Sequence, residues 1–202
     1  MSGNHTDEIG AVILAAGRSR RMGRPKLVLP WGDWTVIEQV VKTLKQAGID
    51  DILLVTGGSR EQIEQVLAGY QVSFAYNDKY ETHEMLTSLQ TGICASNTAL
   101  RALLVVLGDQ PAIQANVIES IVEKFYQQPA KLIIPSYQMR RGHPWLVDKS
   151  LWDELLTMPA ENTLRDFLAA HYHDITYVAV DTPTILSDMD TPDDYKIQRP
   201  GN

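Results

Sequence analysis

The chain has 202 residues, 44% of them apolar, and its 25 acidic and 18 basic residues give a net charge of −7. This length suits one domain with a substantial core, and the negative charge argues against a nucleic-acid surface. A single cysteine, Cys94, excludes an internal disulfide and a cysteine-rich zinc site. Residues 1–10 are polar, and no apolar run reaches membrane-spanning length. We therefore expect one cytoplasmic domain over residues 1–202, with residues 1–9 as a flexible tail.

The first predicted element is a buried strand that opens at Val12 and ends at Gly17. Five basic residues then crowd into nine positions: Arg18, Arg20, Arg21, Arg24 and Lys26. Glycine lets a backbone approach a ligand closely, and arginine and lysine attract anions. The segment has neither the Walker spacing nor G-x-G-x-x-G. Composition alone leaves two interpretations open, a polyphosphate site and a solvated basic loop.

Strands and helices alternate along the rest of the chain. Strands are expected at residues 51–56, 72–76, 102–107, 132–135, 145–147 and 175–180. Helices are expected at residues 36–44, 63–67, 85–94, 117–126, 151–156 and 164–170, with a short one after Pro192. Ser59 and Gln62 have the spacing of a capping box. The alternation predicts an α/β fold, a three-layer α/β/α Rossmann-like sandwich whose mostly parallel mixed sheet binds ligands at the carboxyl ends of its strands.

Two aspartates are candidates for ligand contact. Asp109 follows the most apolar strand in Gly108-Asp109-Gln110-Pro111, where it could also simply form a turn. Asp190 precedes Thr191-Pro192, where it could also cap the last helix. A third candidate segment is Gly142-His143-Pro144, in which a histidine on a turn is commonly structural.

Leu14-Ala15-Ala16-Gly17, followed by Ser19, Arg21-Met22-Gly23 and Lys26, closely resembles the signature L-A-A-G-x-S-x-R-M-G-x-x-K. That signature belongs to the MobA-like nucleotidyltransferases, in the branch of the molybdenum cofactor cytidylyltransferases (MocA-like). Further similarities are G-D-Q-P at Asp109, D-x-D-T-P at Asp190 and G-H-P at His143. The resemblance covers residues 11–195 and implies a fold of the nucleotide-diphospho-sugar transferase type.

The same resemblance implies roles for particular residues. Arg21 and Lys26 would neutralise phosphate charge, and Asp109 and Asp190 would hold Mg²⁺, with Asp109 counted as catalytic. The residues expected to bind the nucleotide are Leu14, Ala15, Ala16, Gly17, Arg18, Ser19, Gly23 and Ser88. Gly142, His143 and Pro144 would face the acceptor.

The implied reaction is transfer of a nucleoside monophosphate, expected to be CMP from CTP, to a phosphate-bearing acceptor, with release of pyrophosphate. The implied acceptor is molybdopterin, and a molybdenum hydroxylase is a possible partner. Two alternatives remain: a sugar- or alcohol-phosphate nucleotidyltransferase, and a non-catalytic nucleotide-binding accessory protein for hydroxylase maturation. The chain departs from the family at Glu84, where relatives carry Gly-Met before Ser-Leu, and at Thr163-Leu164-Arg165, where many carry Gly-Ala-Arg.

Overall fold

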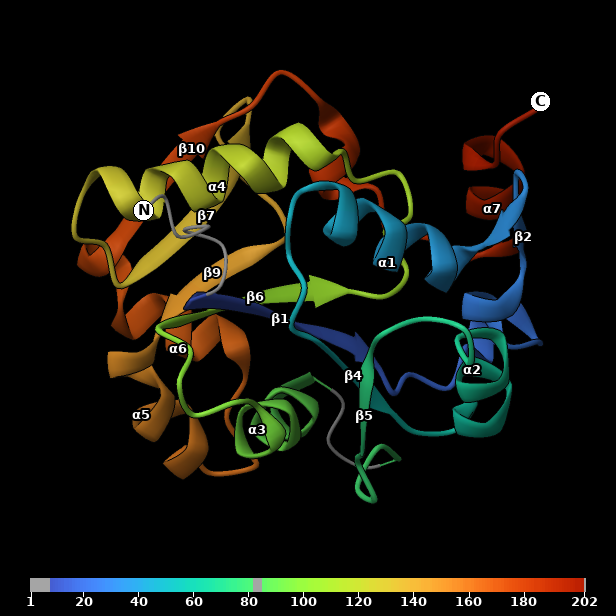
Figure 1. Ribbon diagram of the computed structural model, residues 1–202, viewed down its shortest axis with the longest axis horizontal. Helices are drawn as coiled ribbons and strands as arrows, with labels where there is room; N and C mark the ends of the chain where they lie inside the picture. The colour runs from blue at the N-terminus through green and yellow to red at the C-terminus, as the bar shows by residue number, and fades with distance from the viewer. Residues whose placement is uncertain (1–7, 82–84, 202) are drawn as a thin grey trace.

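The computed structural model describes residues 8–81 and 85–201, and it confirms the predicted alternation of strands and helices (Figure 1). The strands are β1 (Ile9–Ala15), β2 (Pro30–Trp31), β3 (Trp34–Thr35), β4 (Ile52–Thr56), β5 (Ser73–Tyr76), β6 (Ala102–Leu107), β7 (Leu132–Tyr137), β8 (Arg140–Arg141), β9 (Trp145–Asp148) and β10 (Ile175–Ala179). The α-helices are α1 (Val36–Gln46), α2 (Arg60–Val66), α3 (Met85–Ala95), α4 (Ala115–Gln127), α5 (Trp152–Thr157), α6 (Leu164–Ala170) and α7 (Pro192–Gln198). No helix among the described residues has the length and apolar character needed to cross a membrane.

The main sheet is mixed and mostly parallel, as expected. Its strands follow the order β10-β7-β9-β6-β1-β4-β5, and β8 pairs with β7. β1 pairs in parallel with both β4 and β6, whereas β9 runs antiparallel to β6 and β7. The arrows of β1 and β6 point to the same side of the molecule, where β2 and α7 also lie (Figure 1). The loops that follow these strands therefore meet at one edge of the sheet, as the sequence predicts for a ligand site.

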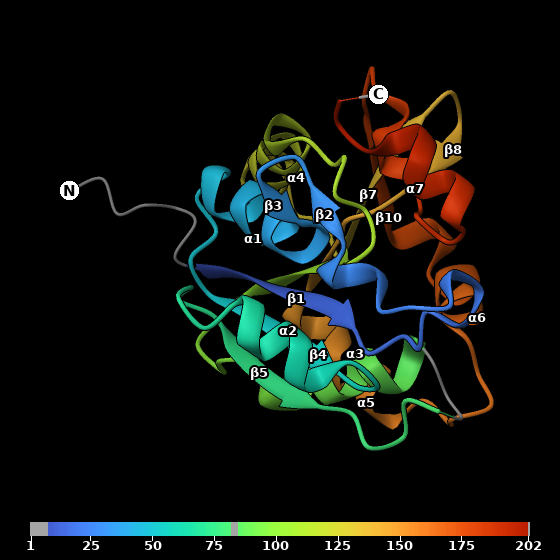
Figure 2. The same cartoon turned by 90° about the vertical axis from the view of Figure 1, so that its right-hand side faces the viewer.

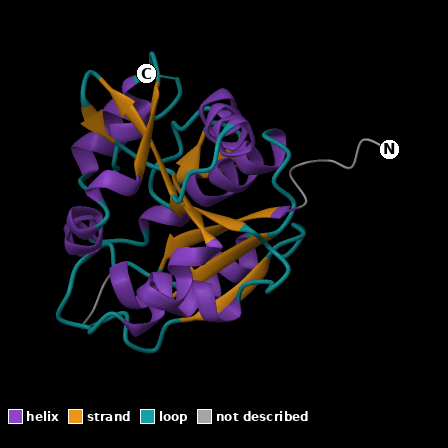
Figure 3. Cartoon of the chain, turned by 90° about the vertical axis from the view of Figure 1, so that its left-hand side faces the viewer, coloured by secondary structure: helices purple, strands orange, loops and turns teal. Residues whose placement is uncertain are grey.

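Helices cover both faces of the sheet and make the three layers (Figure 3). Alternate residues of β1, including Ile9 and Ile13, point to a core formed with α1 and α4. Val12, between them, points to a second core formed with α3, α5 and α6. A strand that is buried on both faces has a continuous apolar sequence, and this pattern predicted β1.

Two sequence predictions are wrong in detail. Ile9 is 1% exposed and pairs with Ala102, so β1 begins inside the predicted tail; residues 1–7 of that tail lie outside the described residues. Gly10 interrupts the apolar pattern because a Cβ there would meet Leu100 Cδ1 at 2.6 Å. Ser59 precedes α2 but its side chain makes no capping hydrogen bond, because its backbone (φ −120°, ψ 31°) departs from the extended conformation of a typical N-cap.

The structure adds a small hairpin that the sequence did not suggest. β2 and β3 form this separate two-stranded sheet, which leads directly into α1. In Figure 2, which looks toward the site edge, β1, β4 and β5 lie side by side and the hairpin lies beside α1. The hydroxyl of Tyr195 in α7 donates to Pro30 O at 2.7 Å, so the C-terminal helix is tied to this hairpin.

Candidate active site

A cleft of about 350 Å³ opens at the carboxyl ends of β1 and β6. Its lining comes from three segments far apart in the sequence: the loop after β1, the turn after β6 and the approach to α7. The lining residues are Leu14, Ala15, Gly17, Arg18, Ser19, Arg20, Arg21, Lys26, Leu27, Asp109 and Asp190. Most residues that sequence reasoning assigned to a nucleotide and a metal are thus brought together in one cleft.

The basic loop after β1 has a defined conformation. Ser19 (φ 49°) and Gly23 (φ 66°) adopt left-handed backbone conformations on either side of a 3-10 turn at Arg20–Met22. Met22 is buried and anchors that turn in the core. The amide of Lys26 donates to Ser19 Oγ at 3.1 Å, which closes the loop on itself. The loop therefore has a defined backbone, although Arg18, Arg20, Arg21 and Arg24 are exposed to solvent.

Asp109 is positioned by the turn after β6. The amide of Gly108 donates to Leu14 O at 3.1 Å, and a Cβ on Gly108 would lie at the same distance from that oxygen. Glycine thus lets the end of β6 approach the end of β1 closely. The carbonyl of Asp109 accepts from Met189 N at 3.2 Å, which joins the turn to the segment before α7.

Asp190 is positioned by the start of α7, but it is not the helix cap. Thr191 is the N-cap and forms a complete capping box with Asp194. The Asp194 carboxylate also accepts from Asp190 N at 3.2 Å. These contacts fix the backbone of Asp190 and leave its carboxylate free to face the cleft, so the alternative in which Asp190 itself caps the helix is wrong.

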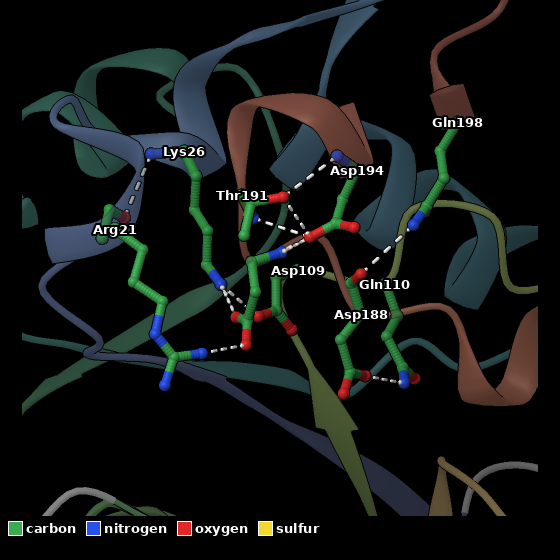
Figure 4. Close-up of polar contacts among 10 residues, drawn as sticks. Arg21, Lys26, Asp109, Gln110, Asp188, Thr191, Asp194 and Gln198 are labelled. Atoms are coloured by element: carbon green, nitrogen blue, oxygen red, sulfur yellow. Dashed lines mark hydrogen bonds and ion pairs between the residues drawn. The ribbon is translucent and has the colours of Figure 1, made fainter. Parts of the chain in front are cut away.

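The centre of the cleft is an ion cluster (Figure 4). Lys26 Nζ lies 2.5 Å from Asp109 Oδ2 and 3.0 Å from Asp190 Oδ1. Arg21 Nη1 lies 3.0 Å from the other oxygen of Asp190. Burial acts to lower the pKa of the Lys26 ammonium, but Asp109 and Asp190 outweigh it and raise that pKa above its ordinary value. Lys26 is therefore a permanent cation in this site.

Sequence reasoning gave no role to Gln110, which the structure places beside the cluster (Figure 4). Its side chain is buried, and Nε2 donates to Asp188 Oδ1 at 2.6 Å and to Ile185 O at 3.4 Å. Burial raises the pKa of the Asp188 carboxyl, the Gln110 hydrogen bond opposes that rise, and Asp109 and Asp190 add to it.

The predicted acceptor segment packs beside this region. A Cβ on Gly142 would meet Ile185 O at 2.3 Å, so glycine is required by the close approach of the two backbones. The His143 ring stacks on Trp145, with centroids 4.4 Å apart, and burial lowers its pKa to about 4. The peptide bond between His143 and Pro144 is cis. His143 is thus a neutral, packed imidazole at physiological pH, outside the residues that line the cleft.

Some predicted nucleotide contacts also lie outside the cleft lining. Ala16 is buried behind it, and Gly23 lines a neighbouring hollow with Arg24, Gly58 and Tyr80. Ser88 is buried in the first turn of α3, where its hydroxyl accepts from Asn77 Nδ2 at 3.0 Å. Glu84, the departure from the family pattern, lies outside the described residues.

The carboxylates of the cleft fit a hard divalent cation. Asp109 and Asp190 each direct an oxygen at one ammonium, so both already share a single cation. Among residues 8–81 and 85–201, no group of three or more His, Cys, Asp or Glu is arranged to hold a metal. Two carboxylates fit a hard divalent cation that takes its remaining oxygen ligands from outside the protein.

Comparisons with known proteins identify the family of the chain. The sequence matches the family model of the MobA-like NTP transferase domain over residues 11–175. The chain belongs to the MobA-like NTP transferase family. This membership makes it a nucleotidyltransferase by family.

Relatives of this family resemble the chain over nearly its whole length. It is 28% identical over 190 residues to the molybdenum cofactor cytidylyltransferase of Escherichia coli K12, covering 93% of each chain. Rv0371c of Mycobacterium tuberculosis superposes with a TM-score of 0.82 at 26% identity, covering 94% of this chain and 96% of the other. A nucleotidyl transferase from Methanothermobacter gives 0.81 at 27% identity, covering 98% and 97%. These structures confirm the nucleotide-diphospho-sugar transferase fold, and Rv0371c has also been solved in complex with manganese.

Proposed function

We propose that the chain transfers a nucleoside monophosphate, CMP from CTP, to a phosphate-bearing acceptor of the molybdopterin type. The observation that carries this proposal is the ion cluster: a half-buried lysine and an exposed arginine converge with two carboxylates in a cleft at the strand ends. Such a cleft can hold a polyphosphate and a divalent cation together. The whole-length similarity to a molybdenum cofactor cytidylyltransferase supports the choice of donor and acceptor.

In this proposal the triphosphate lies along the basic loop, where Arg21 and Lys26 contact it. A phosphate oxygen of the acceptor attacks the α-phosphorus, the bond from that phosphorus to the bridging oxygen of the β-phosphate breaks, and pyrophosphate leaves with the electron pair. The acceptor oxygen is already anionic, so no proton has to be removed and no general base is needed. The protein acts by holding the reactants in line and by placing positive charge where negative charge develops.

Asp109 and Asp190 would hold Mg²⁺ in this site. When bound, the cation supplies charge neutralisation at the phosphates and fixes their orientation. Lys26 and Arg21 then remain available for phosphate oxygens that the cation does not reach.

The proposed preference for CTP follows from the narrow turn after β1. Ala15 and Ala16 are both buried, and a Cβ on Gly57 would meet Ala16 O at 2.5 Å, so the turn has little freedom to move away from a larger base. A pyrimidine suits this space better than a purine. We expect kcat/KM for CTP to exceed that for GTP by at least about 100-fold. Competition among the four NTPs at fixed Mg²⁺ and acceptor measures this preference; a GTP preference would contradict the assignment of the base and leave nucleotidyl transfer intact.

Pyrophosphate release across a panel of NTPs and acceptors tests the proposal, with Asp109→Asn as the inactive control. Release that needs both CTP and molybdopterin is the expected result. Release only with sugar or alcohol phosphates would favour the first alternative, for which the partial match to GlmU is a specific observation: 30% identity to the Syntrophomonas wolfei protein over 136 residues, which span 29% of that protein. Nucleotide binding without release under any condition would favour a non-catalytic accessory role in hydroxylase maturation.

A further inference from the structure

The strand β10 forms one end of the main sheet, and β5 forms the other end (Figure 1). β10 pairs with β7 on one side, and in the part of the chain that the structure describes no strand pairs with its other side. None of the five residues of β10 is buried, whereas all six residues of β6 are. β10 contains no charged residue and no proline, which are features that commonly protect an exposed edge. Its backbone is therefore open to a further strand.

An arginine from β8 lies over this edge strand. Arg141 Cζ is 5.5 Å from the centre of the Tyr177 ring in β10 and 5.7 Å from the centre of the Tyr172 ring, which precedes β10. Both tyrosines are exposed. Among residues 8–81 and 85–201, no carboxylate lies within ion-pair distance of Arg141. The two rings orient the guanidinium, which retains N–H donors for a carboxylate from outside.

The other edge of the sheet has a similar arrangement whose charge is already balanced. Arg60 Cζ lies 5.3 Å from the centre of the Tyr76 ring at the end of β5. Arg60 Nε also lies 2.7 Å from Glu64 Oε1, one turn further along the same helix. Glu64 thus supplies at β5 the carboxylate that Arg141 lacks among the described residues. This difference indicates that the β10 edge suits a segment that brings a carboxylate of its own.

We propose that β10 is the docking site for an extended acidic segment of another protein, which adds to the sheet beside β10 and places a carboxylate against Arg141. Backbone hydrogen bonds to β10 supply the affinity of such a complex, and the ion pair with Arg141 supplies its preference for acidic sequences. Three strands, β7, β9 and β6, separate β10 from β1, so this surface is distinct from the cleft that holds Lys26. The inference does not depend on nucleotidyl transfer.

A second copy of the chain is a poorer occupant of this edge than an acidic segment. Its own β10 strand, with the sequence Ile-Thr-Tyr-Val-Ala, would bring no carboxylate to Arg141. An antiparallel pair of β10 strands would also place both copies of Arg141 on one face of the joined sheet, where like charges repel. The charge at this edge therefore favours a different, acidic partner.

The test uses a fluorescein-labelled peptide of alternating threonine and glutamate, titrated with the whole chain and followed by fluorescence anisotropy. The peptide should bind at least about tenfold more tightly than the same peptide with lysine in place of glutamate. Arg141→Gln should weaken binding at least about tenfold. Arg140→Gln is the matched control: it removes the same charge from the opposite face of β8, and it should weaken binding less than about threefold. Methylation of the glutamate backbone nitrogens removes their N–H donors and should abolish binding.

Amide hydrogen exchange identifies the edge that the peptide occupies. Exchange in Ile175–Ala179 should slow at least about tenfold when the glutamate peptide binds, while exchange in Ser73–Tyr76 of β5 stays unchanged. If Arg141→Gln does not fold, as judged by urea unfolding, this exchange pattern and the methylated peptide decide between the outcomes.

Four results would overturn the inference. One is failure of the wild-type protein to bind the glutamate peptide, or equal binding of the lysine or methylated peptide. Another is an equal effect of Arg140→Gln and Arg141→Gln, which would indicate general charge attraction. Slowed exchange in β5 in place of β10 would mean that the edge is wrong. A concentration-dependent dimer that slows exchange in β10 without peptide would assign the edge to a second copy.

Discussion

Two ion clusters in this molecule have the same charge pattern: one cation lies between two carboxylates, and a second cation pairs with one of those carboxylates, Arg21 with Asp190 and Lys131 with Asp174. Lys26 bridges Asp109 and Asp190 in the cleft at the strand ends. In the helical layer below the sheet, His171 bridges two other carboxylates: Nε2 lies 2.9 Å from Glu154, and Nδ1 lies 2.8 Å from Asp174. The first cluster joins three loops around a cavity, whereas the second joins α5 to the end of α6 and the turn that follows.

The two clusters differ in whether a bound anion or metal could replace the ion-pair partners. The partners of Lys26 face a cleft lined by further cations, so an anion or a metal can replace them. His171 instead packs its ring against Phe167, with centroids 4.7 Å apart, and its pairs hold neighbouring segments in place. We propose that the first cluster binds ligands and that the second holds neighbouring segments together, although Asp174 also lines a separate hollow beside Lys131 and His173.

The largest effect is expected for Asp109→Asn. An amide cannot supply the charge that a hard cation requires, so kcat/KM should fall at least about 1,000-fold. The backbone contact from Met189 to the carbonyl of residue 109 is retained, and the unfolding free energy should change by less than about 1 kcal/mol. Activity at saturating Mg²⁺ and urea unfolding measure the two quantities. Loss of stability with full specific activity would instead mean that Asp109 is a turn residue.

Lys26→Ala should have the next largest effect on activity. It removes a charge-assisted contact to phosphate in a site with little water, a loss of about 2–4 kcal/mol of transition-state stabilisation. For Arg21→Ala, the loss of transition-state stabilisation should lie at the lower end of that range, because water and ions can partly replace an exposed guanidinium. Near-normal kcat/KM and nucleotide affinity in either variant would contradict the assignment of the basic loop.

Gln110→Leu should reduce kcat/KM by about tenfold through Asp188 and the segment before α7. The buried Gln110 amide donates a hydrogen bond to the Asp188 carboxylate. Without this hydrogen bond, Asp188 loses a donor that offsets the negative charge of Asp109 and Asp190. Gln198→Ala is the matched control, since Gln198 donates only to the backbone oxygen of Asp188, at 3.1 Å. The Mg²⁺ dependence of the rate should shift for Gln110→Leu and not for Gln198→Ala. Equal behaviour of the two variants would make Gln110 a packing residue.

The smallest effect is expected at the second cluster. Burial acts to lower the pKa of His171, but hydrogen bonds and charge from Asp174 and Glu154 raise it above 6.5. A raised histidine pKa contributes stability that is fully present below pH 6.5 and is lost as the pH rises through the folded-state value. His171→Gln should therefore cost about 1 kcal/mol at pH 5.5 and less at pH 8.5. Urea unfolding at the two pH values measures this, and a larger cost at pH 8.5 would contradict the charged state of the imidazole.

Much of the fold could be predicted because its strands are buried on both faces. Continuous apolar runs such as Ala102–Leu107 are readily recognised as buried strands. In the helices between the strands, the apolar residues recur at helical spacing. The start of β1 was missed because Gly10 interrupts the apolar pattern, and the hairpin of β2 and β3 was missed because two-residue strands have no periodicity. The capping role of Ser59 failed because spacing alone does not determine the backbone angles of a cap.

Individual residues of the candidate site could be predicted only where they belong to a recognisable sequence motif. The signature indicated Lys26 and Asp109, but their contact depends on a fold that brings positions 83 residues apart to one edge. Gln110 was missed because its partner, Asp188, lies 78 residues away and no local pattern links them. The stacking of His143 on Trp145 likewise depends on how the turn packs, which the string Gly-His-Pro does not encode.

The contrast between the two clusters is tested most directly by measuring pyrophosphate release from CTP, with Mg²⁺ and molybdopterin, for Asp109→Asn and His171→Gln under one set of conditions. The account predicts that Asp109→Asn retains at most about a thousandth of the wild-type rate, while His171→Gln releases pyrophosphate at the wild-type rate. Substantial turnover by Asp109→Asn, or loss of turnover by a folded His171→Gln, would contradict it.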